Sequence, residues 1–496
     1  MNNKILSFFT KEQVKEPIKD KEKIKKLYAF FQPTIFIVMY LMYFVSYLCR
    51  RSLSVGFHGS TGIQHSLGLS LNVYVTLGIL FNIVYCIGKF MGGFVADRAN
   101  IRICLPLAIF TAAVSSGGIA VAGILYQSLI LKSLDDVSMF MYVCWSISAF
   151  ISGLTFPMCA KALVFWYSNK SRPYIWAWWS TSHELGTCCS MLLSAMLLKE
   201  LNWQSVFIVP TLLGIIISII GWALLRDNPS SVGLPDIETY VGNSKSEQQQ
   251  VDEKEIQMNE KEQQIDEKKE EVSEESESYW QVFKKDVLFN KVIWILSLTY
   301  ICVYILRFGP LDWMTKMFME TGKNTDPILA IVPLIVMTVI GTVGTLSISF
   351  VSDKVFGGRR APAIASYLIL TTICMIILRL IFSADDTPAI IQLPEHIKNV
   401  VMYILMGLIG IGVCGPQVMV GGIAAIESGS KKVSATIAGI TGSMGYVGSS
   451  IMFVLGGFSK KYGYQFVNNV WIATGILGII LMLFLWNVRA NKEFSH

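Results

Sequence analysis

About twelve stretches of apolar residues, each long enough to cross a lipid bilayer as an α-helix, follow one another along this chain. In hydrocarbon the backbone must satisfy its own hydrogen bonds, and a spanning helix needs about 20 mostly apolar residues. Of the 496 residues, 53% are hydrophobic and 15% are charged, which a soluble core cannot accommodate. We therefore expect an all-α integral membrane protein. The spans are predicted near 34–57, 72–96, 102–126, 138–166, 174–198, 205–225, 287–317, 327–351, 361–382, 398–425, 433–458 and 467–488.

Lysine and arginine collect in alternate loops, beginning with the segment before the first span, and the loops between them are mostly neutral or acidic. Loops rich in Lys and Arg stay in the cytoplasm, so this pattern places both termini there. A plasma or inner membrane is the first expectation, and an organelle membrane is the alternative. The formal net charge of +6 is then a topology signal, and binding to nucleic acid is not expected.

Residues 243–278 interrupt the apolar pattern with dense Glu, Asp, Lys and Gln. Such a composition cannot form a packed core and indicates a solvated linker. Val251, Met258, Ile265 and Val272 recur every seventh residue, which allows a short helix or a weak partner site besides a plain charged tether. The predicted organisation is a cytoplasmic segment 1–33, a helical bundle 34–225, a linker 226–285, a second bundle 286–488 and a tail 489–496.

The two halves on either side of this linker repeat each other weakly. The stretch that ends in Tyr47-Leu48-Cys49-Arg50 returns as Tyr304-Ile305-Leu306-Arg307. Gly93 to Arg98 returns as Ser349 to Lys354, and the two offsets differ by one residue. We therefore predict two pseudo-symmetric six-helix bundles with a substrate site at their interface near the middle of the membrane.

Arg50 and Arg307 stand at equivalent depths in these halves. A guanidinium inside the bilayer costs at least about 2.5 kcal/mol and cannot escape by deprotonation, so it faces a protein-lined or watery cavity. Either arginine alone could reach the membrane surface along its aliphatic stem. Their duplication favours a shared site for an anion, and the planar donor fork suits phosphate or carboxylate.

Other polar residues are predicted to share this site. Tyr43 and Tyr47 lie on the helix face of Arg50, and Tyr304 lies on the face of Arg307. Arg51 points elsewhere and is assigned a secondary or interfacial role. Lys89, with Tyr85 one turn away, is about 12 Å deep at 1.5 Å per residue. We expect Lys89 to line the anion path, with a structural ion pair as the alternative.

His183 and Glu184 fall near the middle of the fifth span. Histidine changes charge near neutral pH, so His183 is predicted to contact the ligand, although a buried neutral histidine is also an ordinary core feature. A carboxylate would oppose an anion site, so Glu184 is expected to be protonated, paired or turned away.

Charged residues after the second and eighth spans are predicted to form a cytoplasmic gate, with a plain charged loop as the alternative. These residues are Asp97, Arg98, Arg102, Asp353 and Lys354. The glycines 439, 442, 445 and 448 recur every third residue and are interpreted as helix packing alone. The ten cysteines are expected to be reduced. The sequence shows no nucleotide loop, metal cluster or nucleophile with a base, so neither a cofactor nor an enzyme is expected.

Several of these motifs resemble the organophosphate:phosphate antiporters of the major facilitator superfamily. They are Tyr47 to Arg51, Gly88-Lys89-Phe90, Ala96 to Arg102, Trp179 through His183 to Gly186, Tyr304 to Trp313, Ser352 to Phe356 and Arg226 to Pro229. The resemblance covers roughly 28–490 apart from the linker. It implies the major facilitator fold and exchange of inorganic phosphate for glycerol 3-phosphate or a hexose phosphate, by a chain expected to act as a monomer.

The resemblance makes Arg50 and Arg307 the phosphate-binding pair. It also places His183, Lys89, Tyr43, Tyr47, Tyr85, Tyr304 and Trp179 at the site or on the pathway. Ala438 and Thr441 resemble the glycerol-phosphate carriers, whereas Gly415-Pro416-Gln417 and Ile426-Glu427-Ser428 resemble the hexose-phosphate branch. A sensor of the same ester and a proton-coupled transporter of another organic anion are the rival functions.

Overall fold

The computed structural model describes residues 15–59, 61–168, 171–237, 239–241, 284–321, 327–382, 391, 394–424, 428 and 434–488. Within these residues all regular structure is helical. The charged insert predicted at 243–278, with its heptad positions, lies outside the described residues.

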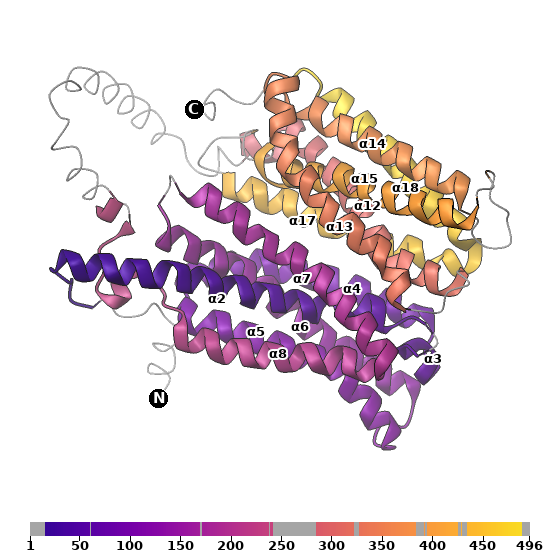
Figure 1. The fold of residues 1–496 in the computed structure, drawn as a ribbon, viewed down its shortest axis with the longest axis horizontal. Helices are drawn as coiled ribbons and strands as arrows, with labels where there is room; N and C mark the ends of the chain where they lie inside the picture. Colours follow the sequence, from indigo (N-terminus) through magenta and orange to yellow (C-terminus); the bar gives the residue numbers. More distant parts are fainter. Residues whose placement is uncertain are drawn as a thin grey trace.

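Twelve long helices are present in the described part of the chain, six before the linker and six after it (Figure 1). The first half contains α2 (Lys21–Gly56), α4 (Leu71–Arg98), α5 (Ile101–Gln127), α6 (Leu134–Trp166), α7 (Arg172–Glu200) and α8 (Trp203–Leu224). The second half contains α12 (Lys291–Thr321), α13 (Pro327–Phe350), α14 (Arg360–Ile381), α15 (Glu395–Val418), α17 (Ser434–Gly457) and α18 (Ser459–Phe484). Short helical segments lie between the long helices of both halves. They are α3 (Ile63–Leu67), η1 (Pro229–Val232), η2 (Lys284–Leu288), η3 (Val351–Val355) and η4 (Met419–Ile423).

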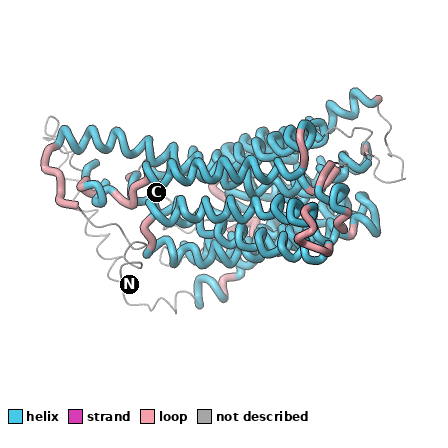
Figure 2. Tube along the Cα trace, turned by 90° about the horizontal axis from the view of Figure 1, so that it is seen from below, coloured by secondary structure: helices cyan, strands magenta, loops and turns pink. Residues whose placement is uncertain are grey.

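Each half forms its own bundle, and the long helices run alongside one another (Figure 2). In the first half α4 and α5 pack on α6, and α2 packs on α7 and α8. The corresponding contacts in the second half are those of α13 and α14 with α15, and of α12 with α17 and α18. The predicted pair of six-helix bundles is confirmed.

The first helix begins earlier than its apolar stretch. The predicted span starts at 34, but α2 begins at Lys21, because the Asp20 carboxylate accepts hydrogen bonds from the backbone N–H groups of Glu22 and Lys23. Such a cap satisfies donors that the first turn leaves unpaired. Pro33 lies inside the helix without ending it.

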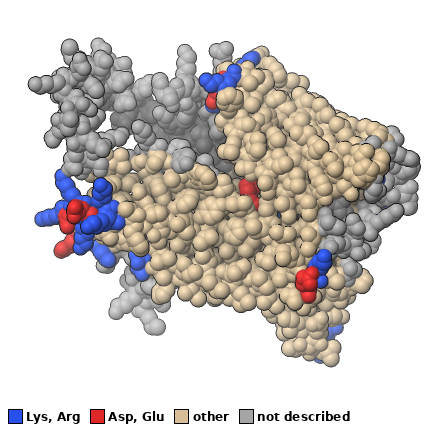
Figure 3. Space-filling view, in the orientation of Figure 1, with Lys and Arg blue, Asp and Glu red and all other residues tan. Residues whose placement is uncertain are grey.

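Ten of the described helices are long and apolar enough to cross a membrane. On the face shown in Figure 3, Lys, Arg, Asp and Glu gather at the left, at the top and at the lower right, and a red patch near the centre interrupts the uncharged surface between these groups. The other two long helices, α7 and α17, pack against α13 and α4 of the opposite half. Because they line this interface, they can carry polar residues and glycine that lipid would disfavour.

The end of the molecule where α2 begins and α18 ends is called the terminal end below. The opposite end, which carries residues 57–71, is called the distal end. Between them α4 and α17 run antiparallel, and their side chains meet in a succession of pairs. Tyr74 packs on Phe453, Asn82 donates to Ser449 across 3.0 Å, and Tyr85 packs on Tyr446. This row of pairs joins the halves from the distal end to mid-depth.

Candidate functional site

Arg50 lies six residues before the end of α2 and is surrounded by aromatic rings. Its guanidinium carbon is 4.2 Å from the ring centroid of Tyr85 and 5.0 Å from that of Tyr47. Its Nη1 donates to the Tyr47 hydroxyl, and its Nη2 lies 3.5 Å from the hydroxyl of Tyr446 in the other half. None of the ion pairs among the described residues includes Arg50. Aromatic faces stabilise the cation, but they leave its charge uncompensated.

Arg307 lies on α12 and is in a different electrostatic environment. It is 4% exposed, and its Nη2 lies 2.6 Å from Oε1 of Glu184 on α7 of the other half. The same carboxylate oxygen is 3.0 Å from Nε2 of His183. Of the three states expected for Glu184, the structure shows the paired one. This carboxylate therefore already supplies one negative charge at the predicted anion site.

A continuous set of contacts joins the two arginines. Arg50 contacts Tyr47, and the Tyr47 ring lies 5.7 Å from that of His183. His183 contacts the Glu184 carboxylate, which pairs with Arg307. The two guanidinium groups that sequence duplication pairs thus occupy one site between the bundles. Glu184 adds to that site a carboxylate, whose charge is opposite to that of the arginines.

Lys89, Tyr43 and Trp179 lie on the terminal side of Arg50. The Lys89 ammonium is 4.8 Å from the ring centroid of Phe156 and 5.5 Å from that of Tyr446. No ion pair among the described residues includes Lys89, so the alternative of a structural ion pair is not what the structure shows. Trp179 is 1% exposed and packs on Tyr43 at 4.7 Å between centroids.

Tyr304 lies one turn before Arg307 on the same helix. Its ring packs on Tyr446 at 5.5 Å, and its hydroxyl is 3.4 Å from that of Tyr300. A Cβ at Gly445 would lie 2.7 Å from the Tyr304 ring, so the absence of a side chain there lets α17 approach α12. Gly445 therefore has the packing role expected of the glycine run. By contrast, nothing lies within 4 Å of a Cβ at Gly439.

A second ion pair lies closer to the distal end. Nη1 of Arg51 is 3.1 Å from Oδ1 of Asp312, and both side chains are at most one-tenth exposed. The Tyr74 hydroxyl donates to the Asp312 carbonyl across 2.8 Å. Arg51 and Tyr74 belong to the first half and Asp312 to the second, so these contacts, here called the distal lock, hold the distal ends together.

The structure describes the side chains of three predicted gate residues, Arg102, Asp353 and Lys354. Asp353 pairs with Arg360 in its own half, and its side chain is 56% exposed. Lys354 is exposed, and Arg102 is half-buried at the start of α5. The side chains of Asp97 and Arg98 lie outside the described part of the structure.

Three residues of the site could not be assigned from sequence reasoning. Tyr446 was hidden in the glycine run, and Asn82 and Ser449 belong to no motif. One sequence signal could have identified Tyr446: its neighbour Gly445 indicates a close approach of two helices at mid-depth. Arg51 was expected at an interface, but its partner Asp312 lies in the other half and no sequence spacing relates them.

Comparisons with known proteins agree with this architecture. The family model described as Major Facilitator Superfamily matches residues 39–453. A protein of Chlamydia trachomatis serovar D named "Probable hexose phosphate transport protein" is 28% identical over 488 residues, covering 97% of this chain and 96% of that protein. The "Glycerol-3-phosphate transporter" of Bacillus subtilis is 27% identical, with 96% of each chain covered. The "Membrane sensor protein UhpC" of Salmonella typhimurium is 26% identical, with 99% of each covered.

Solved structures with the same fold are more distant in sequence. The xylose transporter XylE from E. coli, in a partially occluded inward open conformation, superposes with a TM-score of 0.63 at 15% identity. The superposition covers 92% of this chain and 99% of that one. A bacterial homologue of the human lysosomal transporter Spinster gives a TM-score of 0.62 at 14% identity, covering 92% and 96%.

Proposed function

This chain belongs to the Major Facilitator Superfamily, and we propose that it exchanges a phosphate ester for inorganic phosphate across the membrane. The observation that carries the proposal is Arg50, a partly buried guanidinium that is surrounded by aromatic rings and has no ionic partner among the described residues. It lies in one site with Arg307 of the opposite half. A cation left uncompensated inside a membrane protein requires an anionic ligand.

Charge supports a phosphate dianion as that ligand. Arg50, Lys89 and Arg307 supply three positive charges, and Glu184 supplies one negative charge. These four side chains together leave two positive charges, which match one dianion. Glu184 already pairs with Arg307, so Arg50 and Lys89 are the cations of the site that have no ionic partner among the described residues.

Alternating access follows from the position of the site between the bundles. A phosphate that binds Arg50 of one half and Arg307 of the other draws the halves together and offsets the cost of occluding Arg50. The loaded carrier therefore crosses faster than the empty one, and exchange becomes obligatory. In this conformation the distal lock holds the distal end together. Ligand access is then from the terminal end, which the positive-inside pattern places in the cytoplasm.

Names of the relatives suggest two substrates. Relatives that cover nearly the whole chain are named for hexose phosphate and for glycerol 3-phosphate. Both share the phosphate ester that the arginine pair would bind. One chain supplies both halves of the site, which supports a transporter that works as a monomer.

Proteoliposomes give the direct test. Purified protein is reconstituted, vesicles are loaded with inorganic phosphate, glycerol 3-phosphate or glucose 6-phosphate, and uptake of labelled phosphate is measured. We expect uptake only into loaded vesicles. Equal uptake into empty vesicles would contradict obligatory exchange, and no uptake into any vesicle would contradict antiport.

A sensor is the second candidate, because one relative matched over 99% of both chains is named a membrane sensor protein. A sensor would bind the same ester at the same arginines but would carry little flux. Ligand binding measured by calorimetry without exchange in the proteoliposomes would favour it. A proton-coupled carrier, the third possibility, would respond to an imposed pH gradient even when the vesicles contain no phosphate.

A further inference from the structure

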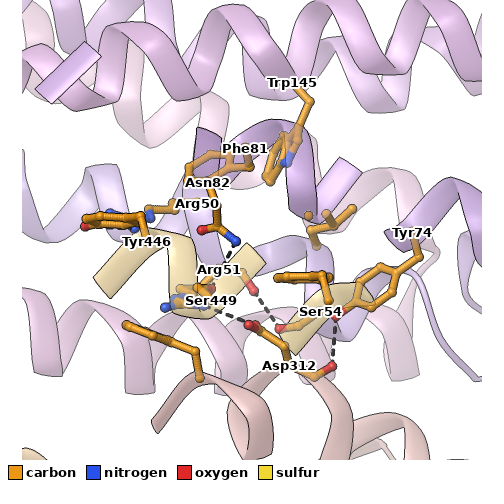
Figure 4. A pocket seen from close by; sticks show the side chains of 14 residues that line it. Arg50, Arg51, Ser54, Tyr74, Phe81, Asn82, Trp145, Asp312, Tyr446 and Ser449 are labelled. Atoms are coloured by element: carbon orange, nitrogen blue, oxygen red, sulfur yellow. Dashed lines mark hydrogen bonds and ion pairs between the residues drawn. The ribbon is translucent and has the colours of Figure 1, made fainter. Parts of the chain in front are cut away.

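A cavity adjoins Arg50 on the distal side and is not explained by phosphate binding. Its walls come from both halves and begin at the level of Arg50 and Tyr446 (Figure 4). From there it extends toward the distal lock, where Arg51 and Asp312 close it. Lys89, Tyr43 and Trp179 lie on the other side of Arg50. A ligand held by its phosphate at Arg50 therefore has a separate space into which the rest of the molecule can extend.

The cavity wall combines polar groups with aromatic faces. Trp145 of α6 reaches into it, is 2% exposed, and its Nε1 has no hydrogen-bond partner among the described residues (Figure 4). The Asn82 amide and the Ser449 hydroxyl meet in the wall. The ring of Phe81 lies 5.1 Å from that of Trp145, and Phe453 adds a further apolar face.

A buried N–H donor without a partner is costly, and the Trp145 donor lines a cavity in which a ligand acceptor can satisfy it. Hydroxyl groups can accept from Trp145 and exchange hydrogen bonds with Asn82 and Ser449. The C–H faces of a sugar can pack on Phe81. Few polar groups on mostly apolar walls are typical of a small-molecule site.

We propose that this cavity is the subsite for the alcohol part of the ester, and that it selects an uncharged, hydroxyl-bearing group such as a sugar. The proposal rests on the proposed exchange function and adds where the rest of the ester binds. Trp145 is its specificity-determining residue. A site built to hydrogen-bond a hydroxyl rejects analogues that lack it, because its own buried groups are then left unpaired.

The charges of the cavity also exclude a class of esters. Arg51 is already paired with Asp312, and Arg50 is occupied by the phosphate. No described cation lining the cavity then remains for a second anionic group, and the Asp312 carboxylate would repel one. Carboxylated esters such as 3-phosphoglycerate should therefore bind less well than sugar phosphates.

The test compares inhibition constants against labelled phosphate uptake for four ligands: methyl phosphate, glycerol 3-phosphate, glucose 6-phosphate and 3-phosphoglycerate. Methyl phosphate has the phosphate without a hydroxyl-bearing group. In the native protein glucose 6-phosphate should inhibit more strongly than methyl phosphate. Trp145→Phe removes the N–H donor and keeps a ring. It should raise the inhibition constant of glucose 6-phosphate roughly fivefold to tenfold more than that of methyl phosphate.

Trp166→Phe is the matched control. Trp166 lies on the same helix, is equally buried and also has an unpartnered Nε1, but it packs on Phe31 far from the cavity. It should not change the ratio of the two constants. The subsite is refuted if Trp145→Phe raises the inhibition constants of both ligands equally. It is also refuted if Trp166→Phe changes the ratio of these constants as much as Trp145→Phe does.

A measurement without mutation covers the case in which Trp145→Phe does not fold. Deoxy analogues of glucose 6-phosphate are tested on the native protein, and at least one should inhibit several-fold more weakly than the parent. Equal inhibition by all of them and by methyl phosphate would overturn the subsite while leaving phosphate exchange intact. Loss of phosphate exchange in the native protein would instead refute the proposed function.

Discussion

Arg307 and Glu184 form an ion pair between the two halves, with 2.6 Å between Nη2 and Oε1, at the place where a phosphate is expected to bind. The carboxylate compensates Arg307 in the empty site, so an incoming phosphate competes with it. Empty and loaded states then differ less in electrostatic free energy than they would with two uncompensated arginines. This moderates the affinity for phosphate and eases its release.

Glu184→Gln should therefore bind phosphate more tightly and turn over more slowly. Loss of a partly buried counter-ion at this distance changes affinity by roughly tenfold. The Michaelis constant and maximal rate of phosphate exchange measure both effects. Glu200→Gln, at the exposed end of the same helix, is the matched control and should be neutral. An unchanged or raised Michaelis constant in Glu184→Gln would show that the carboxylate does not compete with phosphate.

Replacing Arg50 by Lys keeps the charge but loses the planar fork and its packing on Tyr85 and Tyr47. Phosphate exchange should fall roughly 10- to 100-fold, because charge-assisted bidentate hydrogen bonds are lost. Arg307→Lys should behave similarly. Labelled phosphate uptake into phosphate-loaded vesicles gives the rates, and near-native rates in both variants would refute the phosphate clamp.

Asp312→Asn should weaken the distal lock. Arg51 would lose its partner while remaining buried, which favours the conformation in which the distal ends separate. A single cysteine introduced as Ser54→Cys, with the native cysteines replaced, lines the distal cavity and reports on access from the distal side. Its alkylation by an impermeant reagent should rise roughly tenfold in Asp312→Asn. An unchanged rate would mean that the ion pair does not control opening.

Acid should also favour opening of the distal end. His58 follows α2, is fully buried and packs on Tyr74. Burial and then the nearby Lys316 lower its pKa from 6.5 to about 3. The neutral form is therefore the one that fits the closed end. The stability that His58 contributes is complete above pH 6.5 and is lost progressively as the pH falls toward 3.

The alkylation assay at pH 7.5 and pH 5 measures this dependence when each rate is divided by that of a free thiol at the same pH, because the thiolate is the nucleophile. His58→Gln should remove most of it, whereas His65→Gln should preserve it, because His65 is exposed. Among the described residues, Tyr74 packs on His58, Lys316 is a nearby charge, and beyond Tyr74 lies Asp312. An unchanged pH dependence in His58→Gln would assign the effect to one of them.

Gly445→Ala tests the close approach of α17 to α12. The new methyl group would lie 2.7 Å from the Tyr304 ring, and overpacking of this kind costs about 1–3 kcal/mol. Gly439→Ala is the matched control, because its Cβ would meet open space. Thermal unfolding in detergent should show a lower midpoint only for Gly445→Ala. Equal midpoints would mean that the ring moves freely aside.

The fold followed from the sequence because apolar length and duplication are local, one-dimensional signals. Arg50 and Arg307 could be paired in the same way, since each is marked by the helix that carries it. The residues that contact each other across the interface could not be paired from the sequence. Tyr446, Ser449 and Asp312 meet Arg50, Asn82 and Arg51 only after two bundles have packed, and no periodicity within one helix specifies that register.

Glu184 shows the same limit from the opposite side. The sequence showed that a carboxylate near the anion site needed an explanation, and left three of them open. Choosing among them required the position of α12 relative to α7, which is a property of the assembled halves. The start of α2 at Lys21 differs from the predicted start at 34 for another reason. The Asp20 cap and charged helix-forming residues extend the helix beyond its apolar segment.

The row of contacts between α4 and α17 also determines how far each part of the interface must travel. Tyr74 lies eleven residues from Tyr85, about 16 Å along the helix axis. If the bundles rotate by about 10° about the level of Tyr85 and Arg50, Tyr74 moves by about 3 Å while the groups near the pivot hardly move. That displacement is enough to break the hydrogen bond to Asp312. A small rotation thus opens one end of the path while the bound phosphate stays within reach of both arginines.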